Sequence, residues 1–370
     1  MENYVVSARK YRPTGFDEVV GQSHITTTLQ NAIENDHLAQ ALLFCGPRGV
    51  GKTTCARILA KMVNQAGNEA QPQIIDTETA LNIFELDAAS NNSVDDIRNL
   101  IDQVRYPPQH GRFKIYIIDE VHMLSQAAFN AFLKTLEEPP PYAIFILATT
   151  EKHKVIPTIL SRCQIYDFNR IEISDITNHL KLIAEKEEIK TEEEALHLIA
   201  QKADGALRDA LSIFDLIVTF SENNEITYSD TINNLQILDY DYYFSVTEDL
   251  LNENMAQALL VYDKILRNGF DGHDFLVGLA NHFRNLMMCK DNETVSLLEV
   301  SESVKKKYAE QANSSPMSFL LSGLNLLSKA DLEYKARKNQ RLHVELTLMK
   351  IAHLNAAITL QQHDGAEKKK

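Results

Sequence analysis

The residues best suited to chemistry lie in one short stretch, GPRGVGKT at 46–53, which has the spacing G-x-x-x-x-G-K-T. Its glycines let the backbone wrap so that N–H groups point at phosphate oxygens. Lys52 would reach the terminal phosphates of ATP, and the Thr53 hydroxyl would bind Mg²⁺. A glycine-rich turn without a ligand is the alternative, but the apolar run before it and the helical pattern after it argue against that. The residues expected to contact the nucleotide are Gly46, Pro47, Arg48, Gly49, Val50, Gly51, Lys52, Thr53 and Thr54.

A second stretch, IYIIDEVH at 115–122, ends an apolar run on two carboxylates. The four apolar residues indicate a buried strand, and Asp119 follows at its carboxyl end, where ligands bind in parallel sheets. Asp119 is therefore expected to hold Mg²⁺ together with Thr53. Glu120 beside it is placed to orient or deprotonate an attacking water, with capping of the next helix as the alternative. The pair predicts hydrolysis rather than binding alone.

Two hydroxyls end a further apolar run, AIFILATT at 143–150. Thr149 is expected to sense the terminal phosphate or the attacking water, and Thr150 is the neighbouring candidate for the same role. The alternative for either residue is a threonine at a strand end that only satisfies the backbone.

The elements that must position these residues follow from apolar patterning. Apolar runs of strand length predict β-strands at 40–46, 113–119, 143–150 and 164–168. Helical spacing predicts helices after the glycine-rich loop, at 94–106 and at 125–138. Because the strands alternate with helices, we expect an α/β fold with a mostly parallel sheet that is covered on both faces.

The pattern changes near residue 169, where the strand signal ends. Three amphipathic helices are predicted at 174–189, 191–205 and 206–220, and further helical stretches include 255–269 and 273–289. The last residues, HDGAEKKK, have the composition of a disordered tail. The sequence therefore predicts an α/β domain, then a small helical domain, then a second helical domain.

Composition narrows the class of protein. The 370 residues are 44% hydrophobic and 24% charged, which is typical of a globular protein, and no apolar run is long enough to span a membrane. Four widely spaced cysteines argue against a disulfide framework and favour the reducing cytoplasm. The net charge of −14, of which −10 falls after residue 168, excludes a globally basic nucleic-acid binder. Any contact with DNA therefore requires a local patch.

A series of motifs gives the chain a family resemblance. They are, in order, SARKYRP, FDEVVGQ, GPRGVGKTT, ELDAASNNSVDDIR, GRFKIYIIDEVHMLS, FNAFLKTLEEPP, LATTE, ILSRC and GALRDALS. Together they resemble the bacterial clamp-loader ATPases, the gamma and tau subunits of DNA polymerase III, densely over 4–220 and more weakly over 235–360. The resemblance implies an AAA+ P-loop ATPase domain at 1–168, with a strand at ELDAAS. It further implies a three-helix lid at 169–232, a helical collar for oligomerisation at 233–360 and a disordered tail at 361–370.

The resemblance also implies nucleotide contacts outside the glycine-rich loop. Val19 and Val20 match positions that contact the adenine. Arg208 matches a sensor arginine that touches the phosphates bound by its own subunit, with an ordinary helix arginine as the alternative. The residues that flank the adenine position are Arg9, Tyr11, Arg12 and Pro13.

Two further regions of resemblance concern other molecules. In TILSRCQIY, Arg162 matches an arginine finger that points at the γ-phosphate in a neighbouring subunit, and a surface salt bridge is the alternative. Cys163 beside it lacks the base that a cysteine nucleophile needs, so a buried thiol is favoured. The region that faces DNA in the family implies contacts from Asn91, Asn92, Ser93 and Arg98, with a capped surface helix as the alternative.

One departure from the family pattern affects the expected metals. Family members usually carry four zinc-ligand cysteines before the ELDAAS strand, and residues 63–87 contain none. Acids and amides do not replace thiolates in a tetrahedral zinc site, so we predict no structural zinc. ATP and Mg²⁺ are the expected cofactors.

The preferred function is an ATPase motor subunit of the sliding-clamp loader. Its expected partners are the other clamp-loader subunits in a ring, the sliding clamp and primer-template DNA, with no membrane. A non-hydrolysing, ATP-responsive scaffold is one alternative, and Lys52, Asp119 and Glu120 argue against it. A Holliday-junction branch-migration motor is another, and the acidic, helical C-terminal region argues against that.

Overall fold

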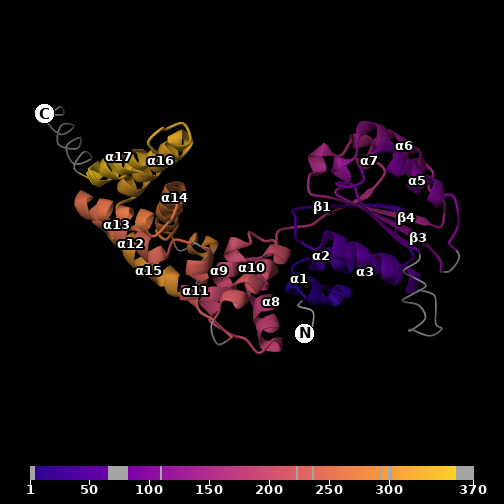
Figure 1. Ribbon diagram of the computed structural model, residues 1–370, viewed down its shortest axis with the longest axis horizontal. Helices are drawn as coiled ribbons and strands as arrows, with labels where there is room; N and C mark the ends of the chain where they lie inside the picture. Colours follow the sequence, from indigo (N-terminus) through magenta and orange to yellow (C-terminus); the bar gives the residue numbers. More distant parts are fainter. Residues whose placement is uncertain are drawn as a thin grey trace. The chain divides into compact units, whose positions relative to one another are not determined.

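The computed structural model of the protein describes residues 5–65, 82–108, 111–221, 224–235, 237–291, 293–298, 300 and 302–355. The chain divides into two compact units, Met1–Glu225 and Ile226–Lys370 (Figure 1). The finer boundaries expected at residues 168 and 232 stay a prediction. The tail expected at 361–370 lies outside the described residues.

The first unit is built on a five-stranded sheet with parallel strands in the order β2-β3-β4-β1-β5. The strands are β1 (Ala41–Cys45), β2 (Ile83–Asp87), β3 (Lys114–Asp119), β4 (Ala143–Thr149) and β5 (Gln164–Asp167). Every residue of β1 and β4 is buried, which explains why these strands are uninterrupted apolar runs. Four strands confirm the predicted runs, and β2 matches the strand that the resemblance implies.

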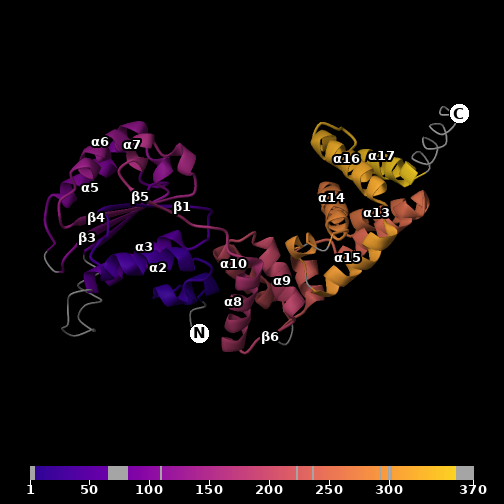
Figure 2. The ribbon, with the colours of Figure 1, turned by 180° about the vertical axis from the view of Figure 1, so that it is seen from behind.

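Helices cover both faces of this sheet, as predicted. Figures 1 and 2 show α2 and α3 on one face and α5, α6 and α7 on the other. Each face has its own apolar core. The bounds are α2 (Ser23–Glu34), α3 (Lys52–Gln65), α5 (Val94–Val104), α6 (Gln126–Glu137) and α7 (Pro157–Leu160), with 3₁₀ turns η1 (Phe16–Glu18), η2 (Val121–Met123) and η3 (Lys152–Lys154).

The pairing register aligns the carboxyl ends of the strands. Cys45 at the end of β1 lies opposite Thr149 of β4 and Asp167 of β5. Asp87 of β2 lies opposite Asp119 of β3. Residues that are far apart in the sequence therefore reach one edge of the sheet, the edge at which ligands bind in parallel sheets.

The chain after β5 forms the three predicted helices α8 (Ile173–Lys186), α9 (Glu193–Lys202) and α10 (Leu207–Phe220). Helix α10 contacts the short N-terminal helix α1 (Ser7–Lys10). β6 (Lys190–Thr191) and β7 (Glu225–Ile226) pair in a small sheet that the sequence pattern did not indicate. Each of these strands has two residues, which is too short for an alternating pattern.

In the second unit, the described residues from 228 to 355 form helices and loops. Its core is rich in aromatic side chains, among them Tyr262, Phe275, Phe283 and Phe319. A Cβ on Gly323 would lie 2.4 Å from the Phe283 ring, because α14 and α16 pack closely there. The elements are α11 (Tyr228–Leu235), α12 (Tyr240–Leu251), α13 (Met255–Arg267), α14 (Gly272–Met288), η4 (Val295–Leu297), α15 (Glu302–Ser314), α16 (Met317–Tyr334) and α17 (Gln340–Ala352).

Candidate nucleotide-binding and hydrolysis site

The glycine-rich loop connects β1 to α3, which is the context that the sequence predicts. Gly46 has φ 149° and Gly49 has φ 78°, and these conformations strain any residue with a side chain. A Cβ would lie 2.4 Å from the Phe168 carbonyl oxygen at Gly46, and 2.9 Å from the Ala206 Cβ at Gly49. Both positions therefore require glycine, because the turn needs these backbone angles and because the segments at Phe168 and Ala206 approach the loop closely.

Lys52 is the first residue of α3 and is 6% exposed. Its Nζ donates hydrogen bonds of 2.7 Å to the carbonyl oxygens of Gly46 and Pro47. Burial lowers the pKa of Lys52, and the nearby charges of Glu120 and Asp119 oppose that shift. The ammonium group is thus held inside the loop, near two carboxylates and at the positive end of a helix.

Thr53 and Asp119 lie side by side. Thr53 Oγ1 donates a 2.6 Å hydrogen bond to Asp119 Oδ2, and both residues line the same cavity. Hydroxyl and carboxylate oxygens are hard ligands of the kind that Mg²⁺ prefers, together with phosphate oxygens and water. The pair therefore fits a magnesium ion bound with a nucleotide.

Glu120 follows β3 in a left-handed conformation, with φ 48° and ψ 45°. Such a conformation is uncommon for a residue with a side chain and is often found at functional sites. Its Oε2 accepts hydrogen bonds from the Thr150 hydroxyl at 2.9 Å and the Thr150 N–H at 3.2 Å. The Glu120 side chain makes no capping hydrogen bond to η2, so its carboxylate does not serve as the helix cap that was the alternative.

Thr149 is fully buried and bonds to a residue that sequence reasoning missed. Its Oγ1 lies 3.1 Å from His122 Nδ1 and accepts a 3.1 Å hydrogen bond from the Glu151 N–H. The same His122 nitrogen lies 3.3 Å from a Glu120 oxygen, and Nε2 lies 3.2 Å from a Glu151 oxygen. His122 therefore links the end of β4 to Glu120. The sequence feature that could have pointed to His122 is its position two residues after Glu120 in the DEVH stretch.

A cavity of about 520 Å³ lies among these residues, a size that suits a nucleotide. Most of the predicted site residues line it, namely Tyr11, Arg12, Pro13, Val19, Val20, Arg48, Gly49, Val50, Gly51, Lys52, Thr53, Thr54, Asp119, Glu120 and Arg208. The residues predicted for nucleotide binding or hydrolysis that lie outside its lining are Arg9, Gly46, Pro47, Thr149, Thr150 and Arg162, and the residues predicted to face DNA, Asn91, Asn92, Ser93 and Arg98, also lie outside it. The lining also contains residues that were not predicted, namely Ala8, Asp87, Ala89, Ile171, Leu207 and Leu211.

Arg208 is the second residue of α10 and lies at this cavity. Its backbone N–H donates a 3.4 Å hydrogen bond to the Gly49 carbonyl oxygen. The N-terminus of α10 therefore lies against the glycine-rich loop, which places the Arg208 side chain near the predicted phosphate position.

Arg162 lies beyond the cavity lining and is bound within its own chain. Its NH2 pairs with Glu137 Oε1 at 2.5 Å, and its NH1 donates a 2.7 Å hydrogen bond to the Thr158 carbonyl oxygen. The salt-bridge alternative is thus present in the structure, while the action of Arg162 on a neighbouring subunit stays a prediction. Burial raises the pKa of the Cys163 thiol to about 12, so this group stays protonated and is a poor nucleophile.

The residues expected to face DNA lie at the start of α5. The Ser93 hydroxyl accepts a 3.2 Å hydrogen bond from the Asp96 N–H, and the Asp96 carboxylate accepts one from the Ser93 N–H. Arg98 is 67% exposed and pairs with Asp95 at 3.3 Å. The capped surface helix is therefore present, and DNA contact through Asn91, Asn92, Ser93 and Arg98 stays a prediction.

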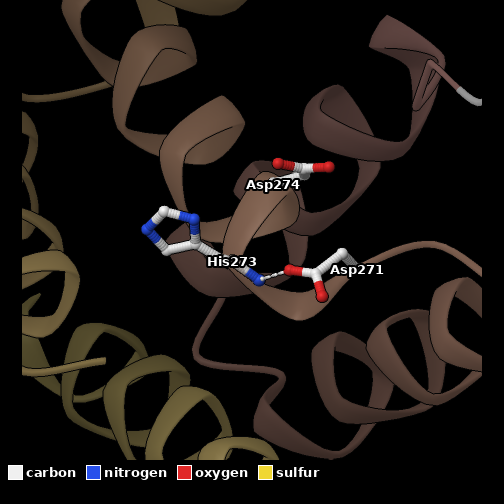
Figure 3. A group of neighbouring side chains, drawn as sticks. All are labelled: Asp271, His273 and Asp274. Carbon is white, nitrogen blue, oxygen red and sulfur yellow. Dashed lines mark hydrogen bonds between the residues drawn. The ribbon is translucent and has the colours of Figure 1, made fainter. Parts of the chain in front are cut away.

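The second unit contains one group of possible metal ligands among the residues described, Asp271, His273 and Asp274 (Figure 3). Asp271 is the N-cap of α14, and its Oδ1 accepts a 2.6 Å hydrogen bond from the His273 N–H. His273 Nε2 lies 2.7 Å from Asp331 Oδ1. The close spacing of these side chains is explained by the capped start of α14 and the bond to Asp331, and we assign no metal to the group.

Two expectations concern membranes and zinc. Over the described part of the chain, no helix combines the length and the apolar character that crossing a membrane requires. Residues 66–81, which make up most of the stretch behind the zinc prediction, lie outside the described residues, so the absence of structural zinc stays a prediction.

Family models match nearly the whole chain in three consecutive pieces. Residues 21–172 match the DNA polymerase III delta subunit, and residues 175–223 match the ATPase lid domain of the DNA polymerase III clamp loader subunit. Residues 235–363 match domain III of the DNA polymerase III subunits gamma and tau.

Among solved structures, the RuvB Holliday junction branch migration motor of Thermotoga maritima matches with a TM-score of 0.48 and 19% identity, over 65% of this chain and 79% of that one. The clamp loader delta protein of Bacillus subtilis matches with a TM-score of 0.38 and 16% identity, over 88% and 99%. Likenesses of this degree do not bear on function.

Curated relatives are similar over almost the full length of this chain. DNA polymerase III subunit tau of Bacillus subtilis is 38% identical over 96% of this chain, which spans 65% of that protein. The tau subunit of Escherichia coli K12 is 36% identical over 94%, and the chain spans 55% of its length. The gamma subunit of Buchnera aphidicola subsp. Schizaphis graminum is 36% identical, and the match covers 94% of this chain and 98% of that one. The chain therefore belongs to the gamma and tau family of bacterial DNA polymerase III, clamp-loader subunits with the AAA+ fold.

Proposed function

We propose that this protein is the ATPase motor of a bacterial sliding-clamp loader in the cytoplasm, in which ATP binding and hydrolysis drive loading of the ring clamp onto primed DNA. The observation that carries the proposal is the meeting of Lys52, Thr53, Asp119 and Glu120 at one cavity, from the end of one strand and the start of one helix. This set provides phosphate binding, metal binding and a base for hydrolysis. The family membership supports the same reading.

Each of these groups has a role in ATP hydrolysis. The loop N–H groups and the Lys52 ammonium would bind the phosphates, and Thr53 and Asp119 would hold Mg²⁺. When bound, Mg²⁺ neutralises charge on the phosphate oxygens. The Glu120 carboxylate would accept a proton from the attacking water, in the orientation that its bonds to Thr150 support.

Two arginines would complete the site from different subunits. Arg208 begins the lid helix beside the glycine-rich loop of its own chain, which supports a contact with the bound phosphates. Arg162 lies outside that cavity, which supports a role at the nucleotide of a neighbouring subunit. Hydrolysis would then require a ring assembly of clamp-loader subunits.

The assignment of domains belongs to this proposal. The lid at 169–232 is supported by the lid family match at 175–223, and the collar at 233–360 by the domain III match at 235–363. The ATPase domain would occupy 1–168, with primer-template DNA contacted through the start of α5. The collar would hold the subunits together.

ATPase assays on the assembled loader test this proposal. We expect slow turnover for the chain alone and strong stimulation when the partner subunits, the clamp and primed DNA are all present. No turnover under any of these conditions would instead favour a non-hydrolysing scaffold. Stimulation by four-way junctions but not by clamp and primed DNA would favour a branch-migration motor.

A further inference from the structure

The N-terminal residues 5–13, here called the strap, are bonded to the lid helices. The Ser7 N–H donates a 2.8 Å hydrogen bond to Asp215 Oδ2 on α10. The Lys10 ammonium and the Tyr11 hydroxyl both donate to the Glu187 carboxylate, which directly follows α8. Lys186 also lies over the Tyr11 ring, 5.9 Å from its centroid. These bonds join the first residues of the chain to residues that lie 176 to 208 positions later.

The strap is at the same time a wall of the nucleotide cavity. Ala8, Tyr11, Arg12 and Pro13 line the cavity, together with Val19 and Val20. Because the glycine-rich loop is expected to bind the phosphates, we expect the strap residues and Val19 and Val20 to face the nucleoside. Tyr11 belongs to both structures, because it lines the cavity and bonds to Glu187 through its hydroxyl.

The charges around Glu187 make this connection a strong one. The hydrogen bonds from Lys10 and Tyr11 lower the pKa of the Glu187 carboxyl, so the group is ionised at neutral pH. Burial and the bond to Glu187 raise the pKa of Tyr11, so its hydroxyl keeps the proton that it donates. Hydrogen bonds to an ionised partner are about twice as strong as neutral ones.

We propose that Glu187 is a positioning residue for nucleotide binding, because it fixes Tyr11 and the strap to the lid on the nucleoside side of the cavity. This inference rests on the proposed function, since it requires the cavity to bind ATP. Its consequence is that the strap and the helices that carry Arg208 are joined by hydrogen bonds, so any displacement of these helices would also displace Tyr11 at the cavity wall.

Calorimetric titration of the purified 370-residue chain with ADP and with pyrophosphate, both with Mg²⁺, tests the proposal. Both ligands use the glycine-rich loop, but only ADP has a nucleoside. Glu187→Gln and Tyr11→Phe should each weaken ADP binding about five- to tenfold, the ordinary effect of losing a charge-assisted hydrogen bond. Pyrophosphate affinity should not change. The double variant should bind ADP about as weakly as Tyr11→Phe alone, since Glu187→Gln weakens the bond that Tyr11→Phe removes.

Glu185→Gln is the matched control, because Glu185 is an exposed residue of α8 and its replacement removes the same charge. It should bind ADP like the unmodified chain. Unchanged ADP affinity in both Glu187→Gln and Tyr11→Phe would overturn the proposal, and so would an equal loss in Glu185→Gln or a parallel loss of pyrophosphate affinity. If the unmodified chain binds neither ligand, the proposed ATPase function itself fails. Tyr11→Phe keeps Glu187 in place, so it serves as the test if Glu187→Gln does not fold.

Discussion

The Thr150 hydroxyl donates a 2.9 Å hydrogen bond to the same Glu120 oxygen that the Thr150 N–H reaches at 3.2 Å. Thr150 therefore bonds directly to the candidate base, beside His122 at 3.3 Å, while the adjacent Thr149 hydroxyl is buried against His122. The two threonines at the end of β4 thus have different partners, although the sequence presents them as equals.

This relationship predicts the effect of replacing Thr150. Thr150→Val keeps the shape of the side chain and the N–H bond but removes the hydroxyl donor. We expect turnover in the assembled loader to fall about tenfold with ATP affinity retained, because one charge-assisted hydrogen bond to the base is lost. Thr150→Ser, which keeps the hydroxyl, should retain most of the turnover. A faster Thr150→Val variant would mean that the bond restrains Glu120 instead of orienting it.

Replacement of Lys52 should separate binding from hydrolysis. Lys52→Ala removes the buried ammonium at the glycine-rich loop, so we expect calorimetry to detect no ATP binding. Glu120→Gln is the comparison, because it should bind ATP normally and lose turnover by a factor on the order of 10² to 10⁴. ATP affinity retained in Lys52→Ala would remove the phosphate-binding assignment. Turnover retained in Glu120→Gln would place the base elsewhere.

Replacement of Arg162 should act only in the assembly. In the reconstituted loader, Arg162→Ala should bind ATP and lose turnover by a factor on the order of 10³ or more, the contribution of an arginine finger. The chain alone should be indifferent to the change, because Arg162 lies outside its own cavity. Normal turnover of the variant loader would reduce Arg162 to its salt bridge with Glu137.

Glu137 offers a second prediction at the same place. It pairs with the Arg162 guanidinium at 2.5 Å, with both side chains partly exposed. Glu137→Gln should lower turnover of the loader several-fold, because Arg162 loses its ion pair and is held only by the bonds of NH1 to the Thr158 carbonyl oxygen and the Ser161 hydroxyl. Glu138→Gln removes the same charge from the adjacent exposed residue and should have no effect. Equal turnover in the two variants would show that the ion pair does not orient the arginine.

A buried histidine in the second unit makes stability depend on pH. His282 is 1% exposed, and its two ring nitrogens lie 3.0 Å from the Tyr308 hydroxyl and 2.9 Å from Gln311 Oε1. Burial lowers its pKa from 6.5 to about 4, so folding favours the neutral ring. The stabilisation is complete above pH 6.5 and is lost as the pH falls towards 4, by about 3 kcal/mol in total.

Thermal unfolding followed by circular dichroism checks this expectation. His282→Gln does not titrate in this range and should be less stable than the unmodified chain at pH 7.5. The difference in Tm between the two should shrink as the pH is lowered to 4.5, because only the unmodified chain must protonate on unfolding. A difference that stays constant over this range would contradict the inferred neutral state of His282.

The sequence was informative where chemistry and local pattern coincide. The glycine-rich loop, Asp119 and Glu120 follow apolar strands that are buried on both faces, so their places at the strand ends could be predicted. The edge strand β2 was harder, because none of its residues is fully buried and no uninterrupted apolar run marks it. The motif resemblance identified this strand where the pattern did not.

The remaining features depend on contacts between distant residues. Glu137 lies 25 residues from Arg162, and Glu187 lies 176 residues from Tyr11. A carboxylate on a helix surface has the same local pattern whether it is solvated or bound to a distant partner. Such partners cannot be predicted until the fold brings them together, which also explains why His122 and the lining residue Asp87 were missed.

The strand order has a consequence for folding of the protein during its synthesis on the ribosome. β1, which leads into the glycine-rich loop, pairs with β4 and β5, whose residues are made about a hundred positions later. Until residue 167 has emerged, β1 cannot have both of its neighbours, and long-range pairing of this kind is slow. A nucleotide that binds at the cavity would therefore stabilise the fold only after these strands have paired.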